Sequence, residues 1–318
     1  MRVAIAFQNG QIQVQIFRSN NLRDNWRAAR AKRIWSDCEK TCGASCAGLF
    51  VSMAMERKKN MSEHLRAYLD FAIETAFLAG QLTLGYYQTG AQPDFKSDDT
   101  PVTVADKKAE ELIRARIEKN FPKHEILGEE FGHGAAFQGA SHRWVIDPID
   151  GTKAFTRGIP LYAILMGLEI EGNAQVGVAY FPALQEMVAA ATGEGCWWNG
   201  RRARVSDVSD LARAYIAFSD PRLFDRYNRR AAWEKIKNAT YHRGGWSDAY
   251  GYLLIATGRA EVMLDPIMDA WDCAPFPPIL SEAGGYFGDW QGKRTIWGKE
   301  GLGATNALLP QVLKLLNE

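Results

Sequence analysis

The sequence of 318 residues has no run of 18 or more apolar residues, which argues against a membrane-spanning helix. Cysteine is also scarce, with five in the chain. Cys38, Cys42 and Cys46 are spaced four apart, whereas Cys196 and Cys273 stand alone. This pattern is not typical of the disulfide framework of a secreted domain, and no nearby histidine completes a zinc site around the first three. We therefore expect a cytoplasmic protein.

An excess of one sign of charge is also absent, because 38 Lys and Arg nearly balance 37 Asp and Glu. The balance is uneven along the chain. Residues 1–60 hold 11 basic and 4 acidic residues, a net charge of +7, which leaves −6 for residues 61–318. A mildly acidic main part gives no electrostatic argument for nucleic-acid binding. No serine has a Gly-x-Ser-x-Gly context, which argues against a serine hydrolase of that type.

Residues 1–60 differ from the remainder in having no sustained helical or alternating period. Their short apolar run, residues 47–54, lies too far from the start for a signal peptide. We expect an extension that is poorly ordered or not native, and the alternative is an Arg-rich organellar transit peptide. The hypothesis that this segment binds RNA or membrane rests on its net charge alone.

From residue 61 the patterns predict regular elements. Ser62 can cap a helix, and a second helix starts near Ala105 and ends at Phe121-Pro122. The apolar stripe of the first helix consists of Leu65, Leu69, Ile73, Phe77 and Leu84. Strands are expected over 143–147, 162–170, 174–181 and 186–190, with a tight turn at 171–173. These strands predict a mostly antiparallel sheet.

After about residue 210 the pattern changes to alternating strands and helices. We expect a strand over 214–218, helices over 223–237 and 248–257, a strand over 261–264, a helix over 272–283 and a strand over 286–289. The sequence thus predicts an extension over 1–60, an α+β subdomain over 61–210 and an α/β subdomain over 211–318.

The most informative motif is the run WVIDPIDGT, residues 144–152. Asp147 and Asp150 lie where an apolar strand ends, with Pro148 between them and Gly151-Thr152 directly after. Carboxylate oxygens suit a hard cation such as Mg²⁺, and the backbone amides after Gly151 can face an anion. The run therefore indicates a metal-dependent phosphate site.

Two distant segments supply further acids: Gly128-Glu129-Glu130, and Trp271-Asp272 followed by the run Glu-Ala-Gly-Gly. Each alone is weak evidence, since an isolated acid pair is usually a solvated turn, and Glu130 is as readily a surface charge as a ligand. Together they provide what a two-metal phosphoryl site needs, in which two ions about 3.5–4 Å apart are held by acids from separate segments.

In this order and with these neighbours, the three segments resemble the inositol monophosphatase superfamily, over roughly residues 61–318. The resemblance implies the layered αβαβα sugar-phosphatase fold, of α+β and α/β character, with the site between its halves. It also implies a phosphomonoesterase that uses two or three Mg²⁺ ions and a metal-activated water, without a covalent intermediate. Inhibition by Li⁺ and a homodimer are further implications.

The same resemblance implies the metal ligands. Asp147 takes the place of the carboxylate that bridges the ions. Glu129 and the backbone carbonyl of Ile149 would complete one metal site, while Asp150 and Asp272 would complete the other. Pro148 restricts the backbone between these ligands.

The resemblance also implies catalytic groups. The Thr152 hydroxyl, with Asp106 behind it, would orient and deprotonate the attacking water, and Glu129 is counted with them as catalytic. Gly151 and Thr152 would present backbone N–H groups to the phosphate. Lys96 resembles a lysine that the family keeps near the metal loop, and a solvated surface position is the alternative.

Substrate choice must come from the second half. The run 243–252 and the segment 288–292 resemble the histidinol-phosphatase branch more than the inositol branch. Histidinol phosphate carries an ammonium and an imidazole, so its pocket should hold carboxylates beyond those for metal. Asp248, Asp265 and, more weakly, Asp269 are such acids, although capping and turn formation would explain them equally. The expected substrate contacts are Asp150, Gly151, Thr152, Trp246, Asp248, Asp265 and Asp272.

Two alternatives stay open. The first is an inositol-1-monophosphatase, whose substrate is a ring of neutral hydroxyls. The second, from another class, is a catalytically inactive family member that binds macromolecules, although all the expected ligands are present. Pro275, Pro277 and Pro278 depart from the family pattern after Asp272, and we expect them to shift or shorten the following helix at the pocket rim.

Overall fold

The computed structural model describes residues 2–8, 11–17, 64–90, 94–95, 101–134, 139–246 and 248–318. Outside these ranges lie Cys38, Cys42, Cys46, Ser62 and Lys96, so the expectations about them stay predictions. The chain divides into two compact units, residues 1–63 and 64–318. Among the described helices, none combines the length and apolar character needed to cross a membrane.

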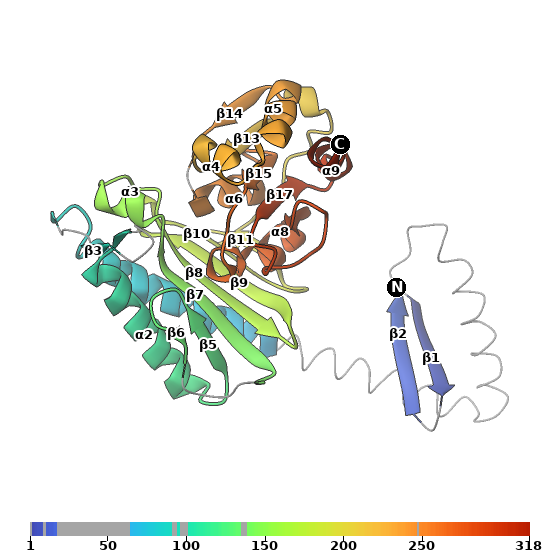
Figure 1. Ribbon diagram of the computed structural model, residues 1–318. Coiled ribbons are helices and arrows are strands. Elements are labelled where there is room, and N and C mark those ends of the chain that lie inside the picture. Colours follow the sequence, from blue (N-terminus) through green and yellow to red (C-terminus); the bar gives the residue numbers. More distant parts are fainter. Residues whose placement is uncertain are drawn as a thin grey trace. The chain divides into compact units, whose positions relative to one another are not determined.

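In the first unit, strands β1 (Arg2–Gln8) and β2 (Gln11–Phe17) pair antiparallel, as Figure 1 shows. The expectation that this segment has no alternating period is wrong for these residues. Gln and β-branched residues alternate through β2, which is the period of a strand. The period is easily missed because it lasts only seven residues before the basic segment begins.

The second unit contains an eight-stranded sheet with the order β12-β11-β10-β9-β8-β7-β5-β6. Its strands are β5 (Glu125–Gly128), β6 (Gly132–His133), β7 (His142–Asp150), β8 (Ala163–Ile170), β9 (Asn173–Phe181), β10 (Glu186–Ala191), β11 (Gly195–Trp198) and β12 (Arg201–Arg202). Only the pairing of β5 with β7 is parallel, so the expected mostly antiparallel sheet is confirmed. A separate short ladder joins β3 (Asp94–Phe95) and β4 (Pro101–Val102).

Two helices cover one face of this sheet, residues 64–84 and α2 (Val104–Asn120). The second was predicted correctly, and the stripe of the first is confirmed at Leu65 and Leu69, with Ile73 partly buried against the same core, but it is wrong at Phe77. Phe77 is 46% exposed and packs at the edge against the Tyr180 ring. After Leu65 and Leu69 the buried face continues through the small residues Ala72, Ala76 and Ala79, which allow the helix to lie close to the sheet.

A second sheet of five strands has the order β14-β13-β15-β17-β16. Its strands are β13 (Tyr215–Phe218), β14 (His242–Gly244), β15 (Val262–Asp265), β16 (Gly285–Gly288) and β17 (Gly301–Thr305). The helices of this half are α4 (Pro221–Arg226), α5 (Arg230–Ala239), α6 (Asp248–Ala256), α7 (Ala270–Cys273), α8 (Phe276–Ala283) and α9 (Leu309–Asn317). The short helix α3 (Thr152–Thr156) and the 3₁₀ turns η1 (Pro182–Leu184) and η2 (Leu211–Arg213) complete the elements.

Alternate residues of the central strands separate the layers. In β8, Ile164 and Met166 join the core under the first two helices, whereas Ala163 and Leu165 join the core formed with α6 and α8. The far face of the five-stranded sheet packs against α4, α5 and α9. The order of layers is therefore αβαβα, as expected, and it is visible in Figure 1. The boundary at residue 210 stays a prediction.

Two expected helices are divided. The helix expected over 223–237 is split into α4 and α5, because Asn228 adopts a positive φ of 56° between them. The helix expected over 272–283 is split into α7 and α8, with Pro275 as the N-cap of α8 and Pro277 in its first turn. The expected shortening of this helix is confirmed, since a first helical turn tolerates proline whereas a helix interior does not. An effect of the prolines on the pocket rim stays a prediction.

The junction between α7 and α8 packs directly on the eight-stranded sheet. Gly167 of β8 and Gly177 of β9 are register partners, and they leave a notch on the sheet surface. A Cβ on Gly167 would lie 2.5 Å from the Ala274 Cβ, and one on Gly177 would lie 2.0 Å from the Pro275 carbonyl oxygen. These close contacts fix the backbone of Ala274 and Pro275 against the sheet, and therefore also the position of Asp272, which lies two residues before Ala274.

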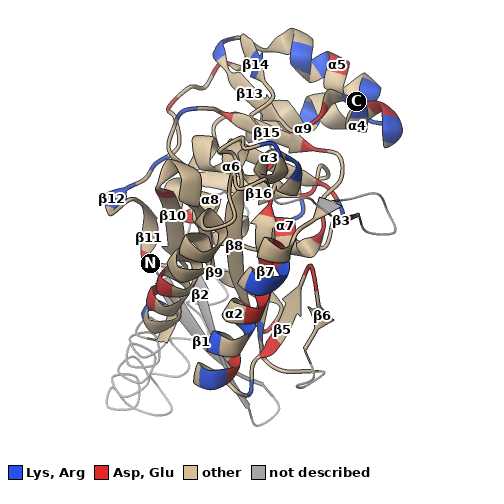
Figure 2. Ribbon diagram, turned by 90° about the vertical axis from the view of Figure 1, so that its left-hand side faces the viewer, with Lys and Arg blue, Asp and Glu red and all other residues tan. Residues whose placement is uncertain are grey.

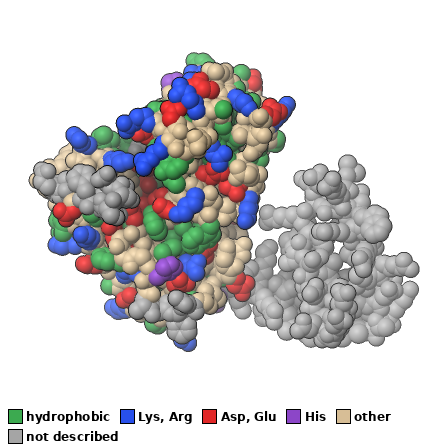
Figure 3. Space-filling view, viewed as in Figure 1, with side chains coloured by type: hydrophobic (Ala, Val, Ile, Leu, Met, Phe, Trp, Pro, Cys, Tyr) green, Lys and Arg blue, Asp and Glu red, His purple; other side chains and the backbone are tan. Residues whose placement is uncertain are grey.

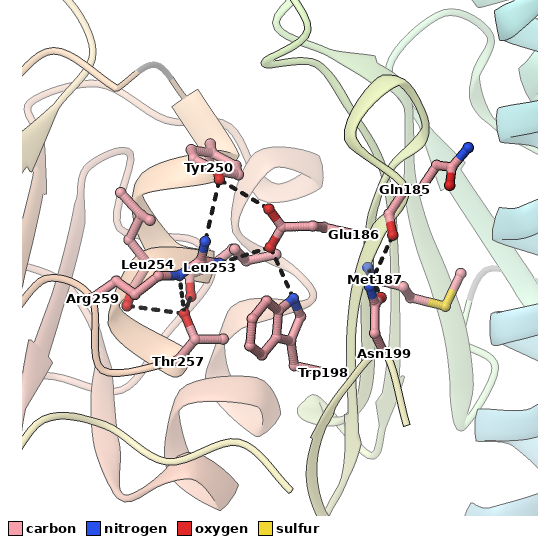
Figure 4. A network of polar contacts seen from close by, with 10 residues as sticks. All are labelled: Gln185, Glu186, Met187, Trp198, Asn199, Tyr250, Leu253, Leu254, Thr257 and Arg259. Carbon is pink, nitrogen blue, oxygen red and sulfur yellow. Dashed lines mark hydrogen bonds and ion pairs between the residues drawn. The ribbon is translucent and has the colours of Figure 1, made fainter. Parts of the chain in front are cut away.

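A polar network also joins α6 and the turn after it to the eight-stranded sheet (Figure 4). The Glu186 carboxylate of β10 accepts hydrogen bonds from Trp198 Nε1 at 2.8 Å and Tyr250 Oη at 3.1 Å. It also pairs with Arg259 at 2.8 Å, and the Arg259 guanidinium lies over the Trp198 ring. Since Tyr250 belongs to α6, the network fixes that helix against the first sheet.

On the face drawn in Figure 3 both signs of charge are interspersed.

Candidate active site

A bulge in β7 brings two acids of the WVIDPIDGT run to one side of the sheet. In a regular strand residues three apart point to opposite faces. Here Asp147 lies opposite Leu165 and Asp150 opposite Ala163, so β7 contains one extra residue between the acids. Pro148, which has no N–H for the ladder, lies in this bulge. Both carboxylates therefore face the same space.

Asp272 reaches that space from α7. Its side chain accepts a hydrogen bond of 2.8 Å from the backbone N–H of Asp269, and this capping interaction fixes its orientation. One carboxylate oxygen from each of Asp147, Asp150 and Asp272 lies within 4.8 Å of the others. Acids from two distant segments thus converge on one point.

The three acids open into a cavity of about 160 Å³. Its lining residues come from the turn after β5, from the end of β7 with the start of α3, and from the starts of α6 and α7. They are Glu129, Asp147, Ile149, Asp150, Gly151, Thr152, Lys153, Asp248 and Asp272. The cavity therefore brings together every residue expected to bind metal.

Burial and mutual repulsion raise the pKa values of these acids. Burial raises the pKa of Asp147 well above its usual value, and the charges of Glu129, Asp150 and Asp272 raise it further. Burial and the Asp248 charge do the same for the pKa of Asp150. Burial raises the pKa of Asp272 to about 8, against a backbone hydrogen bond that lowers it. A cation removes this penalty, and the oxygen-only donor set fits a hard divalent ion.

The Thr152 hydroxyl lies between two acceptors. Its Oγ1 is 3.3 Å from Asp106 Oδ1 and 3.0 Å from the Ile149 carbonyl oxygen, so the acceptors compete for one proton. The other carboxylate oxygen of Asp106 accepts from the backbone N–H and hydroxyl of Thr103, at 2.8 and 2.5 Å. Asp106 is fully buried, and burial raises its pKa. The Asp106–Thr152 pair predicted for catalysis is present, although Asp106 does not line the cavity.

The start of α6 meets the metal-ligand candidates. The backbone N–H of Ala249 donates to Asp150 Oδ2 over 2.9 Å, which ties the two halves together at the cavity. Asp248, the first residue of α6, lines the cavity beside them. Its carboxylate lies 3.3 Å from the place that a Cβ on Gly151 would occupy. This acid is additional to the group of three.

The sequence profile of the inositol monophosphatase family matches residues 64–318. The chain belongs to this family. The histidinol-phosphatase of Chlorobaculum parvum is 43% identical over 240 residues, which cover 75% of this chain and 92% of that protein. The histidinol-phosphatase of Mycobacterium tuberculosis is 36% identical over 230 residues, 70% of this chain and 87% of that protein. The solved extragenic suppressor protein SuhB of Bartonella henselae has a TM-score of 0.74 at 27% identity, over 79% of this chain and 99% of that one.

Membership of the inositol monophosphatase family makes the chain a phosphoric monoester hydrolase. Its layered fold is the one expected and agrees with the solved structures. The family is metal-dependent, and the group of three acids in the cavity could hold a metal ion.

Two residues expected to contact substrate are not in the cavity lining. Asp265 is buried, and its two oxygens accept hydrogen bonds from Ser219 at 2.7 Å and Tyr252 at 2.9 Å. Trp246 is partly buried and stacks on His242, with ring centroids 5.8 Å apart. Asp269 pairs with Lys299 and caps α7. Of the three additional acids, Asp248 alone lines the described cavity.

Two residues near the site were not among those predicted from the sequence, Lys153 and Glu110. Lys153 lines the cavity. Hydrogen bonds with Arg222 lower the pKa of Asp220, and the positive charge of Lys153 lowers it further. The place of Lys153 directly after Thr152 was the available signal. Glu110 lies four residues after Asp106 on α2, and both side chains are fully buried. For Glu110 the sequence offered one indication. It lies four residues after Asp106 on the predicted helix, a spacing that places the two acids side by side on one face.

Proposed function

We propose that this phosphatase is a Mg²⁺-dependent histidinol-phosphatase, which hydrolyses histidinol phosphate to histidinol and phosphate. The observation that carries the proposal is Asp248, a carboxylate in the cavity beyond the group of three acids. A substrate with an ammonium group needs such a partner, whereas a neutral polyol does not. The similarity to two proteins named histidinol-phosphatase, at 43% and 36% identity, supports the same choice.

In this proposal Glu129, Asp147, Asp150, Asp272 and the Ile149 carbonyl hold Mg²⁺. When bound, Mg²⁺ offsets the phosphate charge, lowers the pKa of water and stabilises the leaving oxygen. The proximity of Asp147, Asp150 and Asp272 within 4.8 Å supports their part in this set. Glu129 supports it by lining the same cavity and by raising the pKa of Asp147.

The chain's own groups then orient the reaction. Thr152 accepts a proton from the attacking water while its hydroxyl proton passes to Asp106, and the 3.3 Å separation supports this relay. The raised pKa of Asp106 makes the carboxylate a better proton acceptor. Backbone N–H groups at Gly151 and Thr152 bind the phosphate, with the Lys153 ammonium at the rim. Asp248 binds the cationic end of the substrate.

A substrate panel tests the proposal. Phosphate release is measured with Mg²⁺ from histidinol phosphate, inositol-1-phosphate, adenosine 3′,5′-bisphosphate and fructose-1,6-bisphosphate. We expect histidinol phosphate to have the highest kcat/KM. A preference for inositol-1-phosphate by about tenfold, which is about 1.4 kcal/mol, rejects it.

The ligand variants test the metal part separately. Asp147→Asn and Asp272→Asn each remove a charge that the cation needs, and we expect each to lower phosphate release by more than about 100-fold. Chelation of Mg²⁺ should abolish release from the wild type. Turnover by either variant at the wild-type rate contradicts the ligand set, whatever the substrate.

The family likeness also leads us to propose a homodimer in the cytoplasm, and light scattering tests the oligomeric state.

A further inference from the structure

The turn after β5 presents Glu129 to the cavity, and a buried carboxylate on α2 holds that turn. Glu110 is 0% exposed. Its Oε2 accepts a hydrogen bond of 2.8 Å from the backbone N–H of Glu130, and its Oε1 accepts one of 3.2 Å from the backbone N–H of Phe131. Both donors follow Glu129 directly in the chain, so the Glu110 carboxylate fixes the backbone from which that side chain projects.

The contact is tight on the side of β5. A Cβ on Gly128 would lie 2.1 Å from Glu110 Oε1, so only glycine allows this approach. Arg114, one helical turn beyond Glu110, donates from Nε to Glu110 Oε1 over 2.7 Å and hydrogen-bonds the Gly132 carbonyl. Glu110 and Arg114 therefore hold the turn through hydrogen bonds to the three residues after Glu129, while Glu110 packs against Gly128 before it. Figure 2 shows both signs of charge along α2.

We propose that Glu110 is a positioning residue for Glu129 and that the metal affinity of the cavity depends on it. The inference rests on the proposed function, in which Glu129 is a metal ligand. Glu110 is not among the residues that line the described cavity, so its effect passes through the backbone of residues 129–131. Groups that orient metal ligands typically change metal affinity by about 10–100-fold when removed.

Glu110→Gln is the direct test, because the amide keeps the shape but replaces one acceptor with a donor. A backbone N–H then faces an NH₂ group, and Arg114 loses its counter-charge. We expect Mn²⁺ binding to the metal-free full-length protein, measured by electron paramagnetic resonance, to weaken about 10–100-fold. The Mg²⁺ concentration for half-maximal phosphate release should rise similarly, and KM for histidinol phosphate at saturating Mg²⁺ should stay within about twofold of wild type.

Glu169→Gln is the matched control. Glu169 is another buried glutamate, 3% exposed, with an arginine partner, and it does not line the described cavity. Both variants should lower Tm, since each leaves a partly buried arginine without its full counter-charge. Only Glu110→Gln should weaken Mn²⁺ binding. Equal Mn²⁺ affinity in the two variants overturns the proposal, because Glu110 then acts on stability alone.

Two more variants separate the possible failures. Wild-type Mn²⁺ affinity in Glu129→Gln rejects the ligand set of the proposed function. Weakened binding in Glu129→Gln together with wild-type binding in Glu110→Gln rejects only the positioning role. If Glu110→Gln does not fold, Gly128→Ala decides the matter, since the added methyl displaces the carboxylate without removing it. Wild-type Mn²⁺ affinity in Gly128→Ala then overturns the proposal.

Discussion

At the scale of single residues, the proposed function assigns Asp248 to the substrate and the group of three acids to the metal. Asp248 lines the same cavity as the group of three acids but begins a different helix, α6. We expect Asp248→Asn to raise KM for histidinol phosphate by about tenfold or more, because a charge-assisted hydrogen bond to a cation contributes about 1.5–3 kcal/mol. Steady-state kinetics at saturating Mg²⁺ measure this change.

The control for Asp248→Asn is the Mg²⁺ requirement, which should be the same as in the wild type. Activity on inositol-1-phosphate, a substrate without an ammonium group, should also change little. An equal loss on both substrates contradicts a role in recognising the cation and indicates a general effect on the cavity.

The residues of the site were largely predictable, and the exceptions have physical reasons. Asp147, Asp150 and Asp272 lie in short motifs of adjacent residues, and such motifs are visible in the sequence without knowledge of the fold. Asp265 was expected to contact substrate because it is an acid beyond those implied for metal. Its two hydrogen-bond partners, Ser219 and Tyr252, lie 46 and 13 residues away, and no local pattern indicates them.

At the scale of elements, the notch formed by Gly167 and Gly177 sets the height of α7 above the first sheet. We expect Gly177→Ala to destabilise the protein by about 1–3 kcal/mol, because the methyl meets the backbone of Pro275. It should also weaken Mg²⁺ binding, since Asp272 moves with that backbone. Urea denaturation in EDTA and a metal titration measure the two effects.

Gly134→Ala is the control for this prediction, because the nearest atom to its added Cβ is at an ordinary 3.4 Å. It should leave both quantities near wild type. If Gly177→Ala loses stability and keeps wild-type metal affinity, the notch supports packing without positioning Asp272.

Elements with a strong local pattern were predicted well, as α2 and the strands β7 to β10 show. Those that failed depend on tertiary contacts. In the first helix Leu65 and Leu69 are buried as predicted, but beyond them the buried face follows alanines, which close packing favours over the larger Phe77. The single helix expected over 223–237 breaks at Asn228, a residue type that tolerates a positive φ but does not require one.

At the scale of the whole molecule, the crowded acids make stability depend on pH and metal together. Burial raises the pKa of Asp272 to about 8 and that of Asp265 to about 7, against about 4 in an unfolded chain. The folded protein therefore binds protons more tightly than the unfolded chain. Their stabilising contribution is complete below pH about 4 and is lost as the pH rises through 7 and 8.

We accordingly expect Tm in EDTA to fall between pH 7 and 9. His124 acts in the opposite direction, since burial lowers its pKa to about 4, but its contribution is complete near pH 7. Saturating Mg²⁺ should reverse the fall, because a ligand that binds only the folded state stabilises it. Scanning calorimetry measures Tm, and Asp272→Asn in EDTA should show a smaller fall. A Tm that rises from pH 7 to 9 in EDTA contradicts the argument.

The bulge in β7 has a consequence for how mutation can reach the site. Residues three apart point to opposite faces of a regular strand, so Asp147 and Asp150 need the extra residue to face the same space. The same bulge brings Ile149 into the cavity lining, and its main-chain carbonyl is one of the proposed metal ligands. No amino-acid substitution deletes a carbonyl from the backbone. We therefore expect a substitution at residue 149 to keep this proposed ligand atom, whereas a deletion within the bulge of β7 should displace it.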